Sequence, residues 1–227
     1  MAWSEAKRGP GIPMARDGWR FVVPLMGAAL ICWILGLTGT GWFLLVLAVA
    51  VGAFFRDPER TLPQGDHRVL SPADGVLRYI EEMETELPDG RKVRLRRVSI
   101  VLSIFNGHIQ RAPFAGKISA IRYNKGKFLN AFDDKSSKDN ENNEMWIESP
   151  AGIFGVRQIA GLVARRIVCW CKPGEALRTG DRIGLIRFGS RVELFLPLEA
   201  KLVAREGQTV KAGLSIIAEM APGAPNV

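Results

Sequence analysis

From Phe21 to Phe55 the chain carries no Asp, Glu, Lys, Arg or His. An uncharged, largely apolar run of 35 residues has to be buried in protein or in lipid. One helix of that length would measure about 52 Å at about 1.5 Å per residue, whereas the hydrocarbon core of a bilayer is about 30 Å thick. The Gly-containing string Thr38–Gly41 offers a break. We therefore predict two short apolar helices, over Phe21–Leu37 and Trp42–Phe55.

Positive charge flanks the apolar run on both sides, with Lys7, Arg8, Arg16 and Arg20 before it and Arg56 and Arg60 after it. This pattern would keep both ends of a helical hairpin in the cytoplasm. A secretory signal peptide is the alternative, but its apolar region is shorter than this one. We expect a basic tail over residues 1–20, a membrane-anchoring helical hairpin over 21–55 and one further domain over 56–227. A re-entrant pair of helices is the alternative to the hairpin, and the number of crossings is left open.

The overall charge favours an anionic partner, because the net charge is +8 and the pI is about 9.8. The apolar run makes an anionic membrane surface the expected partner, and we expect no nucleic acid. Three cysteines provide neither a disulfide framework nor zinc-type spacing, and the two histidines are too few for a zinc peptidase. We therefore predict no metal site.

Residues 66–220 consist of short β-like runs separated by Gly, Pro, Asn and Asp, which is typical of a mainly β domain. Two strings of the form Gly-x-x-apolar-x-x-Gly, at Gly174–Gly180 and Gly207–Gly213, resemble the turns of biotinyl/lipoyl-type domains. We predict a mainly β, barrel-sandwich-like domain that follows the helical membrane segment.

The dipeptide Gly189-Ser190 lies between two strand-like segments, residues 182–188 and 191–196. A Gly carbonyl is unhindered and Gly tolerates strained backbone, so a hydroxyl beside it is suitably placed to attack the chain's own backbone. A turn or a β-bulge explains the same dipeptide without any chemistry.

Two further residues complete a candidate catalytic set. Asp74 lies in the turn-forming string Ser71–Gly75, and His108 lies in the loop Gly107–Pro113. An Asp, a His and a Ser from three loops are the parts of a base-activated nucleophile. An Asx turn and an ordinary polar loop residue are the alternative roles of Asp74 and His108.

Five segments, in this order, resemble the phosphatidylserine decarboxylase family, in its short bacterial form with an N-terminal membrane segment: Ser71–Gly75, Gly107–Pro113, Tyr123–Ala131, Gln158–Val168 and Arg187–Val192. The resemblance covers roughly residues 55–200. One departure is Phe-Gly-Ser-Arg around Ser190, where longer members have Leu-Gly-Ser-Thr.

The resemblance implies a self-processing enzyme. Asp74 would orient His108, and His108 would take the proton of Ser190, whose oxygen attacks the Gly189 carbonyl. Cleavage would leave a β chain of residues 1–189 and an α chain of residues 190–227, held together as a heterodimer, with Ser190 converted into a pyruvoyl group. The serine amine of the lipid would form a Schiff base with that group and lose CO2, and phosphatidylethanolamine would be released. His108 is also the candidate proton donor.

The resemblance also implies the lipid contacts and the location. Arg111, Arg165 and Arg166 are candidate ligands of the headgroup phosphate. We expect the protein at the bacterial inner membrane with its catalytic domain on the cytoplasmic side, in phospholipid biosynthesis. A different phosphoserine lipid such as archaetidylserine, a non-catalytic membrane-tethered binding domain and further oligomerisation stay open as alternatives.

Overall fold

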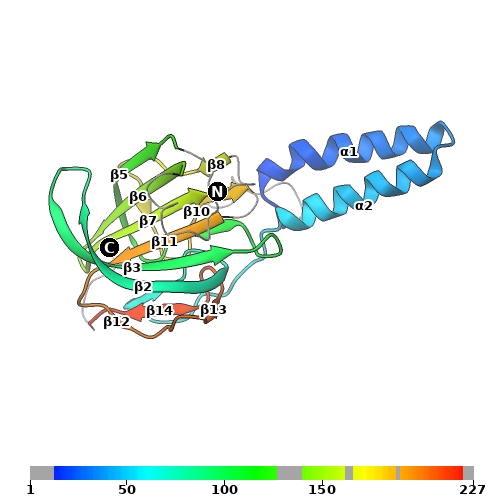
Figure 1. The fold of residues 1–227 in the computed structure, drawn as a ribbon. Helices are drawn as coiled ribbons and strands as arrows, with labels where there is room; N and C mark the ends of the chain where they lie inside the picture. Colours follow the sequence, from blue (N-terminus) through cyan, green and yellow to red (C-terminus); the bar gives the residue numbers. More distant parts are fainter. Residues whose placement is uncertain (1–12, 127–139, 162–165, 188–189, 222–227) are drawn as a thin grey trace. The chain divides into compact units, whose positions relative to one another are not determined.

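The computed structural model describes residues 13–126, 140–161, 166–187 and 190–221. The chain forms two compact units, Met1–Glu59 and Arg60–Val227, and each is described by itself. The first unit is helical and the second is mainly β (Figure 1).

The first unit contains two helices, α1 (Arg16–Ile34) and α2 (Thr38–Phe54), joined by a tight turn. Gly36 lies in the left-handed region, with φ of 76°. Its N–H donates to the Trp33 carbonyl at 3.1 Å, and the N–H of Leu37 donates to the Cys32 carbonyl at 2.8 Å, so α1 ends in a Schellman motif. The break therefore lies at residues 35–37 and not at the predicted Thr38–Gly41, which begins α2.

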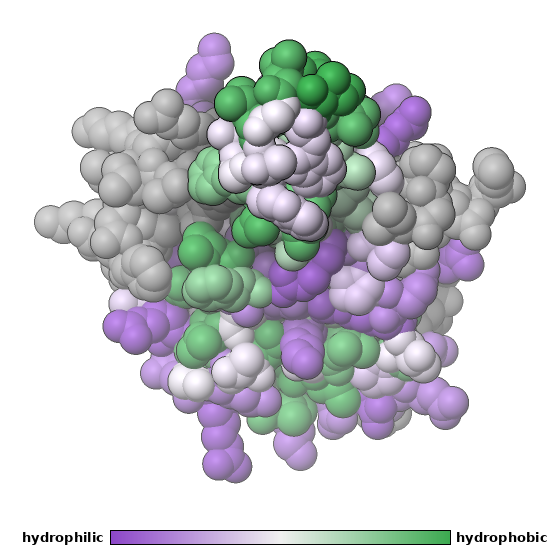
Figure 2. Space-filling view, turned by 90° about the vertical axis from the view of Figure 1, so that its right-hand side faces the viewer, coloured by the Kyte–Doolittle hydropathy of each residue, from purple (hydrophilic) through white to green (hydrophobic). Residues whose placement is uncertain are grey.

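The two helices expose most of their apolar side chains, which are among the green atoms that gather at the top of Figure 2. The exposed fraction is 75% for Ile34, 66% for Phe43 and 65% for Val49. Helix α1 is long and apolar enough to cross a membrane, whereas α2 is apolar but has only 17 residues. An exposed apolar surface of this kind is typical of segments that contact lipid or another protein.

The second unit is built on a curled, fully antiparallel sheet of eight strands in the order β13-β2-β3-β11-β7-β6-β5-β9 (Figure 1). Its strands are β2 (Gly75–Glu86), β3 (Lys92–Leu102), β5 (Gly116–Asn124), β6 (Asn142–Ser149), β7 (Gly152–Ala160), β9 (Ala176–Leu177), β11 (Ser190–Leu196) and β13 (Thr209–Val210). The expectation of a mainly β fold with a barrel-like sheet is confirmed.

Two three-stranded sheets complete the unit. One has the order β1-β14-β12 and the other the order β4-β10-β8. Their strands are β1 (Arg68–Leu70), β14 (Ile216–Glu219), β12 (Lys201–Leu202), β4 (Ile109–Arg111), β10 (Arg182–Arg187) and β8 (Arg166–Cys169). Strands β10 (ending at Arg187) and β11 (beginning at Ser190) are consecutive in sequence but belong to different sheets.

Strand β11 is buried on both faces, because it lies between β3 and β7 in the middle of the large sheet. Val192, Leu194 and Leu196 belong to the main hydrophobic core. The alternate residues include Glu193, whose carboxylate is fully buried and pairs with Arg97 at 3.1 Å and with Arg157 at 3.0 Å. Burying a carboxylate in this way is tolerated only when such partners compensate for the lost hydration.

This ion-pair cluster gives a test of the fold. Glu193→Ala leaves buried arginine charge without its carboxylate, so we expect it to lower the free energy of unfolding by about 3 kcal/mol. The exposed Glu84, which is 3.7 Å from Lys92, provides the control, and Glu84→Ala should cost less than about 1 kcal/mol. Denaturant unfolding of both purified variants measures the difference. Equal losses would show that the Glu193 cluster does not stabilise β11.

Candidate functional site

Three strand ends lie side by side at one edge of the large sheet. Val76 at the start of β2 pairs with Val101 near the end of β3, and the next residue of β3, Leu102, pairs with Ser190 at the start of β11. Asp74 precedes β2, and the turn after β3 leads to His108. The sheet register therefore brings together the three segments that carry Asp74, His108 and Ser190.

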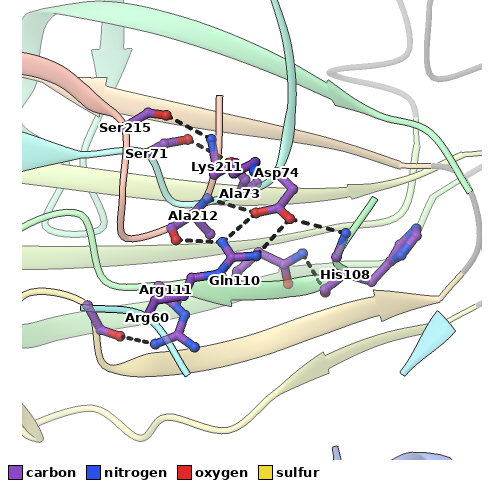
Figure 3. Close-up of polar contacts among 12 residues, drawn as sticks. Arg60, Ser71, Ala73, Asp74, His108, Gln110, Arg111, Lys211, Ala212 and Ser215 are labelled. Atoms are coloured by element: carbon purple, nitrogen blue, oxygen red, sulfur yellow. Dashed lines mark hydrogen bonds and ion pairs between the residues drawn. The ribbon is translucent and has the colours of Figure 1, made fainter. Parts of the chain in front are cut away.

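The Asp74 carboxylate accepts four hydrogen bonds at this edge of the sheet (Figure 3). Its two oxygens accept hydrogen bonds from Arg60, Nη1 to Oδ1 at 2.6 Å and Nη2 to Oδ2 at 2.8 Å. The backbone N–H of Ala212 donates to Oδ1 at 2.8 Å, and that of Gly107 donates to Oδ2 at 3.2 Å. Two parallel bonds from one guanidinium give such a pair both strength and a fixed geometry.

These contacts decide the charge of Asp74. Burial by itself would raise the pKa of the carboxyl, but the hydrogen bonds and positive charge of Arg60 and the two backbone N–H groups outweigh burial and hold the pKa below its ordinary value of 3.8. The Asp74 side chain is therefore a carboxylate at neutral pH, and it serves as a fixed acceptor of hydrogen bonds.

Arg60 belongs to the site, but the sequence does not predict this. A basic residue is also expected directly after a membrane segment, so the charge of Arg60 alone does not indicate a role in the site. Its guanidinium is largely buried, and besides Asp74 it donates to the Ala212 carbonyl at 2.6 Å. Arg60 thus joins the segment that enters the β unit, the turn before β2 and the segment around Ala212.

His108 is buried, and its backbone is held on both sides. The N–H of the preceding Gly107 is bound by Asp74, and the His108 carbonyl accepts from Gln110 Nε2 at 2.8 Å. A chain of buried amides supports Gln110, because Gln158 donates to it at 2.9 Å and Asn143 donates to Gln158 at 3.0 Å. In Figure 3 the imidazole extends away from the Asp74 carboxylate. Asp74 thus acts on this loop through the Gly107 backbone, and a direct action on the imidazole stays a prediction.

Gly107 is required by the close approach of Asp74. A Cβ atom at this position would lie 2.8 Å from Asp74 Oδ2, closer than real Cβ contacts allow. The carboxylate is held by Arg60 and two N–H groups and has little freedom to withdraw.

Ser190 is 1% exposed, and its hydroxyl has no hydrogen-bond partner in the part of the chain that the structure describes. Buried hydroxyls are usually satisfied, so the Ser190 hydroxyl requires an explanation, as does that of Ser99, which is buried without a described partner as well. Its neighbours across the sheet are Leu102 and Ala160. Gly189 lies outside the described residues.

Of the three candidate phosphate ligands, the structure describes Arg111 and Arg166, and Arg111 lies opposite Arg182 at the start of β10. Arg111 is buried, donates to the Gly180 carbonyl at 3.2 Å and extends away from the His108 imidazole in Figure 3. Arg166 is exposed and pairs with Arg187 at the other end of β10, the end that leads to Ser190. Arg165 lies outside the described residues. Of the two described arginines, Arg166 is therefore the one beside the end of β10 that leads to Ser190.

A comparison with protein families gives one match. The family model of phosphatidylserine decarboxylase matches residues 47–218 of the chain. The match includes Arg60, Asp74, His108, Ser190 and Ala212, so the whole hydrogen-bonded cluster lies inside it. The chain belongs to the phosphatidylserine decarboxylase family.

Proposed function

We propose that this chain is the precursor of a pyruvoyl-dependent enzyme that cleaves itself between Gly189 and Ser190 and then converts phosphatidylserine into phosphatidylethanolamine and CO2. The observation that carries the proposal is the buried, unsatisfied Ser190 hydroxyl at a sheet edge where Asp74 holds the loop of His108.

The proposed cleavage uses groups of the chain and, in its last step, one water molecule. His108 accepts the Ser190 hydroxyl proton, and Ser190 Oγ adds to the Gly189 carbonyl carbon. His108 then returns the proton to the Ser190 nitrogen as the amide C–N bond breaks, which leaves an ester between Ser190 Oγ and Gly189 and a free amine on Ser190. Removal of the Ser190 Cα proton then expels Gly189 as a carboxylate, and the remaining unsaturated residue takes up water and releases ammonia. Burial of Ser190 supports this order of events, because excluded water does not compete for the ester.

The residues around Ser190 fit the pyruvoyl group that this chemistry would leave. The position is buried, lacks a hydrogen-bond partner within the described ranges and is fixed by pairing to β3 and β7. The group supplies a carbonyl that draws electrons from the substrate during loss of CO2. His108 is the proposed proton donor to the substrate Cα, and Arg166 is the proposed partner of the lipid phosphate.

The two proposed fragments are interleaved in the fold. The α chain, residues 190–227, contributes β11 between β3 and β7, and it also pairs β14 with β1 and β13 with β2 of the other fragment. It also contributes the Ala212 N–H that binds Asp74. These contacts support a stable heterodimer, since separating the fragments would open the core and the site together.

The helical unit is the proposed membrane anchor. Its exposed apolar side chains and the length of α1 support this role. We place the catalytic unit at the cytoplasmic face of a bacterial inner membrane, where the positive charge flanking the apolar run favours retention and the diacyl substrate is available.

Replacing the nucleophile tests the self-cleavage. Ser190→Ala should leave a single chain of 25.0 kDa and no decarboxylation, because no hydroxyl remains to attack Gly189. Mass spectrometry and CO2 release measure the two effects. Ser119→Ala, a control in β5, should mature normally. A Ser190→Ala chain that is cleaved at the same bond would refute the role of Ser190.

Replacing Arg60 tests the hydrogen-bonded cluster. Arg60→Gln leaves the buried Asp74 carboxylate without its main partner, so we expect self-cleavage to slow by about a hundredfold, equivalent to about 2.7 kcal/mol. Arg60→Lys keeps the charge but not the two-point contact and should restore part of the rate. The exposed Arg91, paired with Asp89, provides the control, and Arg91→Gln should cleave at the wild-type rate. If Arg60→Gln also does so, Arg60 does not position the site.

The lowered pKa of Asp74 predicts a pH dependence of stability. The contribution of its ion pair is fully present above pH 3.8 and is lost as the pH falls through the still lower pKa of the folded state. The melting temperature of Asp74→Asn should therefore lie below that of wild type at neutral pH, and the difference should shrink below pH about 4. A difference that stays constant down to pH about 2 would show that Asp74 does not stabilise the fold as a carboxylate.

A further inference from the structure

The turn between β3 and β4 presents two large apolar side chains to solvent. Ile104 is 54% exposed and Phe105 is 79% exposed. They are the only neighbouring pair of exposed large apolar residues in the described part of the Arg60–Val227 unit. Single exposed apolar residues are ordinary, but an adjacent pair at the tip of a turn indicates a contact surface.

The turn that carries this pair is tightly hydrogen-bonded. The N–H of Ser103 donates to Asn106 Oδ1 at 2.7 Å, and the Ser103 hydroxyl donates to the same atom at 2.8 Å. The N–H of Asn106 returns a hydrogen bond to the Ser103 carbonyl at 3.0 Å. These bonds fix the conformation of the turn with Ile104 and Phe105 at its tip, so the exposure of both side chains follows from the backbone conformation.

The turn is joined to the candidate site at both of its ends. The residue before it, Leu102, pairs with Ser190, and the residue after it, Gly107, donates its N–H to Asp74. Movement or burial of the tip therefore occurs directly beside the residues proposed to carry out the chemistry.

We propose that Ile104 and Phe105, here called the apolar tip, insert into the interface of the substrate-containing bilayer and hold the mouth of the site against the lipid headgroups. The inference rests on the proposed function, in which the substrate keeps its acyl chains in the membrane. Apolar side chains at an interface gain free energy by leaving water, and the contact adds to that of the helical unit.

Charge at the same edge fits an anionic lipid surface. The exposed Arg166 lies opposite Arg187 in the β8–β10 register, at the end of β10 that leads to Ser190, and the N–H of Ile186 donates to the His108 carbonyl at 3.4 Å. Cationic side chains near inserted apolar groups favour binding to anionic headgroups. A bilayer containing phosphatidylserine matches both properties of this edge, whereas a soluble protein partner would need no such charge.

The full-length double variant Ile104→Ser/Phe105→Ser tests the proposal. We expect turnover of diacyl phosphatidylserine in reconstituted phosphatidylcholine vesicles to fall about tenfold. Self-cleavage, and turnover of short-chain, water-soluble phosphatidylserine in detergent solution, should stay at the wild-type level. Val203→Ser is the matched control, because Val203 is also exposed, at 47%, but belongs to a different part of the fold, and it should leave all three rates unchanged.

A direct measurement accompanies the kinetics. After subtraction of the wild-type signal, Phe105→Trp fluorescence should be quenched by brominated lipids in vesicles, and Val203→Trp fluorescence should not. Wild-type turnover in vesicles by the double variant, or an unquenched Phe105→Trp, would overturn the proposal while leaving the proposed function intact. An equal loss of all three rates would also overturn it, since the turn would then support the site itself. If wild type neither cleaves itself nor releases CO2, the proposed function fails, and the quenching still reports on the tip.

Discussion

The ion pair between Arg60 and Asp74 joins parts of the chain that lie far apart in the sequence. A carboxylate taken out of water needs donors for both of its oxygens, and Asp74 obtains them from Arg60, Ala212 and Gly107. Each donor belongs to a different segment, so satisfying one buried charge fixes three segments around it. The position of the His108 loop follows from this arrangement, because its backbone enters the site bound to Asp74.

Strand β11 gives the second constraint. It is buried in the middle of the large sheet, yet it begins at Ser190, where the chain arrives from another sheet. A break in the backbone at that point would remove no strand pairing between β10 and β11, since the two strands do not pair. This topology is compatible with the proposed self-cleavage, because a new chain end at Ser190 would leave the strand pairings of the core in place.

The sequence predicts the β unit well, because alternating apolar residues and turn-forming residues report directly on strands. It also marks Asp74, His108 and Ser190 as a candidate set. It does not mark Arg60, whose charge is equally expected beside an apolar run, nor the amides of Gln110 and Gln158, which look like any polar residue. The sequence also predicts the turn between the two helices a few residues too late, because several glycines lie near it. Only the left-handed backbone of Gly36, which the sequence does not show, identifies the end of α1. Strand pairing depends on contacts between residues far apart in the sequence. Local sequence patterns therefore do not predict that β10 and β11 belong to different sheets.

The intact mass of the purified wild-type protein shows directly whether the chain cleaves itself. We expect two species that separate between Gly189 and Ser190, a large one of residues 1–189 and a small one of residues 190–227 that carries a pyruvoyl group in place of its first serine. A single folded species of 25.0 kDa, uncut and without pyruvoyl, would contradict it.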